Sequence, residues 1–156
     1  MKTLLLILAA LLALPVLADD GDHYYSTSNL HPDRRLDLWQ KECGSCHMAY
    51  PPGLLPAAAW RKMMSRLDKH FGADASLSAN EQGELTDFLV KHAGSARRVG
   101  SEVIRITETP HFVKEHRKIA ESVWERASIK SAANCQACHL RAAEGDFSER
   151  QIRIPR

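Results

Sequence analysis

The sequence predicts an all-α fold in which two small helical units pack together, with little or no sheet. Two observations lead to this prediction. The pattern Cys-x-x-Cys-His occurs twice, at 43–47 and at 135–139, each time beside a segment with helical start signals. Apolar residues recur at intervals of three and four along most of the chain, whereas alternating patterns are confined to 103–106 and 152–155. We therefore expect one unit around each motif.

The first 18 residues have the pattern of a secretory signal peptide. Lys2 precedes an apolar run over 4–16, and the run closes on the small residue Ala18 before two aspartates. An uncleaved membrane anchor is the alternative, but a spanning helix needs about 20 apolar residues and Pro15 interrupts the end of this run. We expect a signal peptide over 1–18, cleavage after Ala18 and export to the periplasm.

The N-terminal unit is expected to span 19–94, with a polar, flexible arm before its first helix. Pro32 suits the first turn of a helix that ends in the first motif. A second helix is expected over 56–72, because its apolar residues form one stripe. These residues are Trp60, Met63, Met64, Leu67 and Phe71. A third helix begins at the capping box formed by Ser78 and Glu81, and ends at Gly94.

A connector over 95–109, basic and rich in small residues, is expected to lead into the C-terminal unit at 110–156. Within the connector, 103–106 could be extended. Thr109 and Pro110 form an N-cap and first-turn pair for an amphipathic helix that continues to Trp124.

The last helix is expected to begin after Ser131, to contain the second motif and to end near Gly145. About 47 residues are few for independent folding, so we expect the C-terminal unit to pack on the first through the region of the motifs.

Each motif has the chemistry of covalent c-type haem attachment. Cysteines three residues apart share one face of a helical turn, so both can form thioethers to the porphyrin vinyls while the adjoining histidine reaches the iron. A helical unit around such a motif is the plan of small cytochromes c. We therefore predict two covalently bound haem c groups, held by Cys43, Cys46, Cys135 and Cys138, with His47 and His139 as axial ligands.

Three other roles for these cysteines fit less well. A redox dithiol of the thioredoxin type needs a βαβ context, which the sequence does not offer. A zinc site does not require a histidine directly after the second cysteine of both pairs. A pair of disulfides leaves that histidine unexplained too, whereas two haem motifs use all four cysteines.

The second axial ligand of each iron decides between electron transfer and chemistry on a bound molecule. Six histidines lie outside the motifs: His23, His31, His70, His92, His111 and His116. His70 borders the apolar face of its expected helix, and His116 lies on the apolar side of its own. A solvent-tipped or a buried structural histidine is the ordinary role at such positions. Because two irons need partners, we expect His70 to bind the first iron and His116 the second.

Other ligand sets remain open. His92 is the main competitor, because it continues the apolar stripe of the third expected helix. Met63 or Met64 would give the His/Met ligation of high-potential cytochromes, although methionine within a helical stripe is more often core. Crossed ligation, with His116 on the first haem, is a further alternative.

Beside the two motifs, the segments 50–56, 70–72, 106–110, 145–147 and 152–155, with Trp60 and the pair Glu115-His116, resemble one known family. This is the bacterial periplasmic dihaem cytochrome c family, and the resemblance covers nearly the whole mature chain. It implies low-potential haems with two histidine ligands each. It also implies electron donation to a small monohaem oxygen-binding cytochrome, with a membrane cytochrome b as the source of electrons.

The function expected from the sequence is therefore that of an electron carrier, not an enzyme. A small peroxidase or reductase with one open axial site is the alternative, but no acid/base constellation is evident apart from the spare histidines. A haem-based gas sensor lacks an appended output domain. With 21 basic and 19 acidic residues, the chain has no charge excess for nucleic acid, and we expect a monomer with redox proteins as partners.

Overall fold

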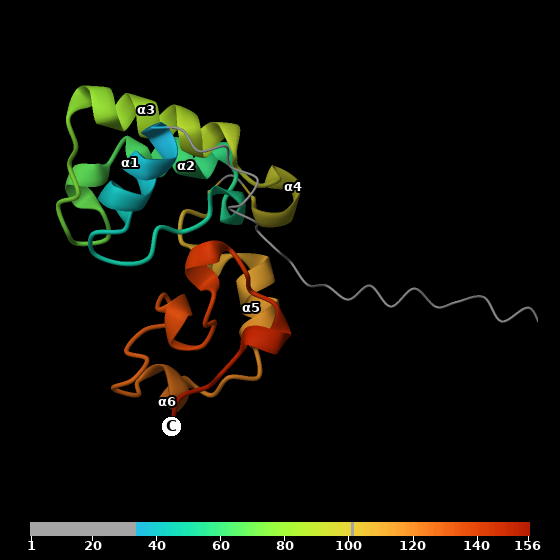
Figure 1. The fold of residues 1–156 in the computed structure, drawn as a ribbon. Helices are drawn as coiled ribbons and strands as arrows, with labels where there is room; N and C mark the ends of the chain where they lie inside the picture. The colour runs from blue at the N-terminus through green and yellow to red at the C-terminus, as the bar shows by residue number, and fades with distance from the viewer. Residues whose placement is uncertain (1–33, 101) are drawn as a thin grey trace, which may run out of the picture.

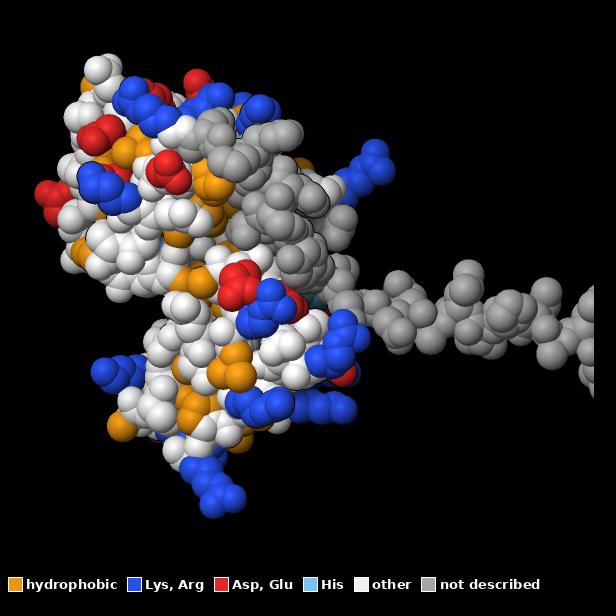
Figure 2. All heavy atoms as spheres, in the orientation of Figure 1, with side chains coloured by type: hydrophobic (Ala, Val, Ile, Leu, Met, Phe, Trp, Pro, Cys, Tyr) orange, Lys and Arg blue, Asp and Glu red, His pale blue; other side chains and the backbone are white. Residues whose placement is uncertain are grey.

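The computed structural model describes residues 34–100 and 102–156, in which short helices are joined by loops and turns (Figure 1). The expected signal peptide, the arm, Pro32, His23 and His31 lie outside the described residues. Within the described ranges there is no strand, only isolated β-bridges. The all-α expectation is thus confirmed. Figure 1 shows two bodies, one built from the helices before residue 94 and one from the helices after residue 109, and the space-filling view in Figure 2 shows the same two bodies.

Three helices form the N-terminal body: α1 (Arg34–Cys43), α2 (Ala57–Met64) and α3 (Ala79–Lys91). Their apolar faces meet in one core, in which the rings of Trp39 and Phe88 lie 5.8 Å apart and Leu85 has no exposed surface. The core contains Trp39, Leu55, Ala59, Trp60, Met64, Leu85, Phe88 and Leu89. This core fixes the end of α1, and with it the position of the first motif.

The second helix is shorter than expected. It ends at Met64, and the chain continues through a 3-10 turn at Leu67–Lys69 instead of reaching Gly72. The side-chain amide of Gln82 in α3 donates to the Met64 carbonyl at 2.7 Å, so a tertiary contact satisfies a carbonyl at the helix end. Phe71 is 43% exposed, so the apolar stripe does not extend that far.

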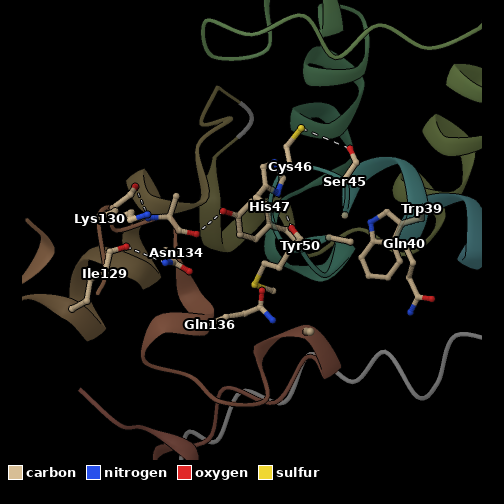
Figure 3. Close-up of a pocket in the computed structure, with 16 residues that line it drawn as sticks. Trp39, Gln40, Ser45, Cys46, His47, Tyr50, Ile129, Lys130, Asn134 and Gln136 are labelled. Carbon is tan, nitrogen blue, oxygen red and sulfur yellow. Dashed lines mark hydrogen bonds between the residues drawn. The ribbon is translucent and has the colours of Figure 1, made fainter. Parts of the chain in front are cut away.

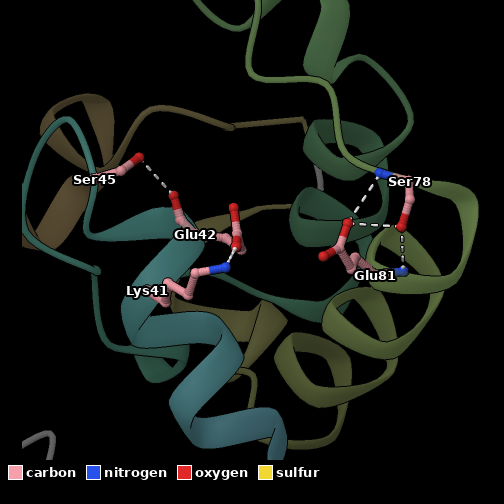
Figure 4. A network of polar contacts seen from close by, with 5 residues as sticks. All are labelled: Lys41, Glu42, Ser45, Ser78 and Glu81. Carbon is pink, nitrogen blue, oxygen red and sulfur yellow. Dashed lines mark hydrogen bonds and ion pairs between the residues drawn. The ribbon is translucent and has the colours of Figure 1, made fainter.

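The capping box before α3 is confirmed. Ser78 Oγ accepts the Glu81 amide, while the Glu81 carboxylate accepts the Ser78 amide at 3.2 Å (Figure 4). The helix ends at Lys91, three residues before Gly94. The Gly94 amide instead donates to the Leu55 carbonyl at 2.8 Å, which ties this end of the unit to the loop before α2.

The connector contains more helix than expected. A short helix, α4 (Ala96–Val99), ends at Gly100, which has a φ of 78°, and a 3-10 turn follows at Ile106–Glu108. Residues 103–105 belong to no strand, and Arg105 has an extended backbone. The Lys62 ammonium pairs with the Glu102 carboxylate at 2.8 Å and so links α2 to the connector.

The C-terminal body has short helices. Thr109 Oγ1 accepts the Phe112 amide at 3.2 Å, which confirms the N-cap of α5 (Pro110–His116). The expected continuation to Trp124 is wrong, because the chain breaks after His116 and forms a separate turn, α6 (Glu121–Trp124). Additional 3-10 turns lie at Ala142–Glu144 and Glu149–Gln151.

The expected helix after Ser131 is also wrong. The second motif lies in a 3-10 turn at Cys135–Ala137. Ser131 Oγ accepts the amide of Ala133, two residues on, which forms a local turn instead of a helix cap. The Asn134 side chain donates to the Ile129 carbonyl at 3.0 Å and so stabilises this non-helical path, in which Lys130 has a φ of 69°.

Candidate haem sites

The first site lies at the C-terminal end of α1. Cys43 is the last residue of the helix, and the Gly44 amide donates to the Gln40 carbonyl at 3.0 Å, which continues the helical turn into the motif. A β-carbon at position 44 would overlap that carbonyl oxygen, so the turn requires glycine. His47, which comes directly after Cys46, is exposed.

The structure brings His47 and His70 together. Their ring centres lie 6.1 Å apart, with 28° between the ring planes. His47 Nδ1 donates to the Met48 carbonyl at 2.7 Å, which leaves Nε2 with a free lone pair. Burial, and then the charge of His47, lowers the pKa of His70, which favours the neutral imidazole that metals bind.

The second site pairs His139 with His116 across 6.0 Å, with 68° between the ring planes. His116 Nδ1 donates to the Phe112 carbonyl at 2.9 Å, and the Phe112 ring stacks on His116 at 4.0 Å. The ring of Trp124 lies 5.8 Å away. Burial, and then His116, lowers the pKa of His139. His116 is therefore held by one hydrogen bond and two aromatic neighbours.

Both histidine pairs have the spacing of two imidazoles that bind one metal ion. Metal–imidazole bonds of about 2 Å each, and roughly 1 Å from each nitrogen to its ring centre, together span about 6 Å. The buried Nδ1 atom of His139 has no hydrogen-bond partner within the described chain. A ring nitrogen in that situation is costly unless a group outside the described residues meets it. The two ring separations fit bound haem.

The cysteines also suit haem attachment. All four are free thiols, and neither motif forms a disulfide. Burial raises the pKa of Cys43 and of Cys135 to about 11 in each case. A thiol of such a pKa carries its proton at neutral pH, unlike the low-pKa cysteines of redox dithiols.

A cavity of about 840 Å³ lies beside the first motif, between the two bodies (Figure 3). Residues 44–50 form one wall, and residues of the segment 129–134 form the opposite one. Its volume falls within the range of about 300–1,000 Å³ typical of cofactor and ligand sites. Residues of the first motif therefore line a cavity at the junction of the two bodies.

The structure places the competing ligands elsewhere. His92 is the C-terminal cap of α3, and its ring lies 5.0 Å from that of Phe88. Met64 is 4% exposed in the core, and Met63 packs against the same cluster. His111 lies in the first turn of α5.

Tyr50 belongs to the site although the spacing of residues alone does not reveal it. Its ring lies 4.8 Å from that of His47, and its hydroxyl donates to the Ala133 carbonyl at 2.6 Å. No local pattern could have indicated this contact, because it joins residues 83 positions apart.

A small helical protein with two Cys-x-x-Cys-His motifs, each beside a pair of facing imidazoles, is a c-type haem protein with two haem sites. The comparisons with known proteins agree. The model of the dihaem cytochrome c family matches residues 39–147. The chain therefore belongs to the dihaem cytochrome c family and carries two covalently bound haem c groups. This class of protein transfers electrons.

Solved structures support the assignment. A dihaem cytochrome c from Shewanella baltica OS155 is similar with a TM-score of 0.70 and 35% identity, over 79% of this chain and 95% of that one. A dihaem cytochrome c from Rhodobacter sphaeroides is similar with a TM-score of 0.63 and 39% identity, over 71% of this chain and 95% of that one. No curated protein sequence matches the chain.

Proposed function

We propose that the protein is a low-potential electron carrier of the periplasm in which each iron binds two histidines. His47 and His70 would hold the first iron, and His139 and His116 the second. The observation that supports this ligation is the pair of ring separations, 6.1 and 6.0 Å, each within one body of the structure. Such local pairs also argue against crossed ligation.

Two histidine ligands favour a carrier over an enzyme. They fill both axial positions, so no position on the iron remains for a substrate. A methionine ligand raises the potential of a cytochrome, so irons with histidine on both sides belong at the low end of the range. A small peroxidase or reductase with one open axial position would instead need one of the two histidine pairs to be absent.

The compartment and the partners follow from sequence pattern and resemblance. The signal-peptide pattern over 1–18 supports export to the periplasm, where c-type haem attachment takes place. None of the helices that the structure describes is long and apolar enough to cross a membrane. We propose a membrane cytochrome b as electron donor and a small monohaem cytochrome as acceptor, with the protein acting as a monomer.

Carbon monoxide binding to the reduced holoprotein tests the proposal. Carbon monoxide needs an open axial position on ferrous iron, so the wild-type absorption spectrum should not change. His70→Ala and His116→Ala should each open one iron to carbon monoxide while both haems stay covalently attached. His92→Ala is the matched control and should remain inert.

Two results would contradict the proposal. Binding of carbon monoxide to the wild-type protein would favour the enzyme alternative. A near-infrared methionine–iron band, or a high-potential couple in a redox titration, would reject histidine at that iron.

A further inference from the structure

Tyr50 connects the two halves of the molecule at the place where the haem motifs approach each other. It lies three residues after His47, and its half-buried ring contacts the His47 ring at 4.8 Å and 31°. Its hydroxyl points to the C-terminal body and donates to the Ala133 carbonyl at 2.6 Å, as Figure 3 shows. One side chain thus touches the axial ligand of the first haem and the backbone of the other unit.

The Ala133 carbonyl is in turn directly joined to the second motif. It accepts the backbone amide of Cys135 at 3.0 Å and lies 3.7 Å from the Cys135 sulfur, the atom that bonds to the second haem. A continuous line of contacts therefore leads from the His47 ring through Tyr50 and the Ala133 carbonyl to Cys135. At one end His47 would bind the iron of the first haem, and at the other Cys135 would form a thioether to the second.

A tyrosine hydroxyl keeps its proton at neutral pH, so the Tyr50 hydroxyl can donate a hydrogen bond to the Ala133 carbonyl. A donor of this kind strengthens the contact where it is partly shielded from water.

We propose that Tyr50 is a positioning residue that ties the axial ligand of the first haem to the attachment loop of the second and so couples the two haems for electron exchange. This inference depends on one part of the proposed function, namely that both haems transfer electrons. In the exchange, one electron leaves a ferrous iron and reduces the ferric iron of the other haem. Tyr50 neither gains nor loses an electron or a proton, and no bond breaks.

The test compares three holoproteins: wild type, Tyr50→Phe and Thr86→Val. Tyr50→Phe keeps the ring on His47 and removes only the hydroxyl. Thr86→Val is the matched control, because it removes a half-buried hydroxyl that donates to the Gln82 carbonyl at 2.6 Å within α3. Haem content is checked first, so that only proteins with both haems are compared.

Two measurements follow. Hydrogen exchange of the amides at 133–138 reports how often the attachment loop separates from Tyr50. Loss of one hydrogen bond of ordinary strength should speed this exchange by about two- to tenfold in Tyr50→Phe. The second measurement is the rate at which one electron redistributes between the haems after rapid partial reduction. It should fall severalfold in Tyr50→Phe and stay at the wild-type value in Thr86→Val.

If Tyr50 has only a structural role, Tyr50→Phe should speed hydrogen exchange without slowing electron redistribution. That result would overturn the proposed coupling of the haems. Unchanged hydrogen exchange in Tyr50→Phe would overturn the tie itself. Tyr50→Leu, which also removes the ring from His47, should slow redistribution at least as much and should shift the absorption of the first haem. Carbon monoxide binding by the wild type would reject the proposed ligation, but the two Tyr50 measurements would still decide this inference.

Discussion

The two candidate distal histidines are held by different neighbours. His116 is fixed from within its own helix by the Phe112 carbonyl and ring. His70 lies in a turn instead, next to Phe71, which has a φ of 52°. The guanidinium of Arg105 lies over the Phe71 ring at 4.1 Å, so the connector helps to hold that turn. The two sites thus share a ring spacing but differ in ring orientation.

The ring orientations predict two distinct electron paramagnetic resonance signals from the oxidised protein. When the two imidazole rings of an iron are nearly perpendicular, they interact equally with two iron d orbitals, which then have nearly the same energy. When the rings are nearly parallel, the energies of these two orbitals differ. The pair at 28° should therefore give a rhombic low-spin signal, and the pair at 68° a signal with a large highest g value. His116→Ala should remove the second signal only, and two identical signals in the wild type would contradict this assignment.

Two glycines should respond to alanine in opposite directions. A β-carbon on Gly94 would overlap the Gly53 carbonyl oxygen, so Gly94→Ala should lower the free energy of unfolding by about 1–3 kcal/mol. Gly83 is exposed in the middle of α3 with open space around it, so Gly83→Ala should raise that free energy by about 0.5–1 kcal/mol. Denaturant unfolding of the holoproteins measures both changes, and changes of equal sign would refute the packing argument.

At the scale of elements, the local start signals were more reliable than the apolar stripes. The capping box at Ser78 and the N-cap at Thr109 were both predicted correctly, because a cap depends on residues within one turn. The stripes of α2 and α5 led to helices that were too long. At the end of α2, Gln82 of α3 donates to the Met64 carbonyl, a partner 18 positions away that no local pattern contains.

The capping box of α3 should make stability depend on pH. Hydrogen bonds from the Ser78 hydroxyl and amide lower the pKa of Glu81 below its ordinary value of 4.5. The stabilisation by this carboxylate is therefore complete above pH 4.5 and is lost as the pH falls through the lowered pKa. Glu81→Gln should lose this part of the acid dependence, as measured by unfolding between neutral and acid pH.

The serine of the same box gives a matched measurement at neutral pH. Ser78→Ala removes the acceptor of the Glu81 amide and should cost about 0.5–2 kcal/mol of stability. A variant as stable as the wild type would show that the cap does not matter to α3.

For the whole molecule, the two bodies differ in how much core the chain itself supplies. Among the described residues, the buried apolar side chains of the C-terminal body are Ile129 and Ala142, whereas the N-terminal body has the cluster around Trp39 and Leu85. A covalent haem is a large apolar group, so it can supply the core that the second body lacks. The C-terminal body should therefore depend more strongly on its haem.

Removal of the second attachment site tests this dependence. The double variant Cys135→Ser and Cys138→Ser should lose the second haem, and protease cleavage should then concentrate within 110–156. The N-terminal body should keep its helices and its haem, as measured by circular dichroism and haem content. Gln136→Ala changes an exposed residue of the same motif and serves as the control. Equal protection of both bodies in the double variant would contradict the argument.

Local sequence patterns were enough to predict the cofactor, the helical class and the starts of α3 and α5, because these depend on residues within a few positions of one another. The motifs at 43–47 and 135–139 and the cap at Thr109 are of this kind. The signal peptide, the unit boundaries and the ligand roles of His70 and His116 remain predictions. Two features appear only in the folded chain: Gln82 of α3 donates to the carbonyl at the end of α2, and Tyr50 reaches Ala133. Each is a contact between residues far apart in the chain, and the energy of such a contact is gained only when the chain is folded.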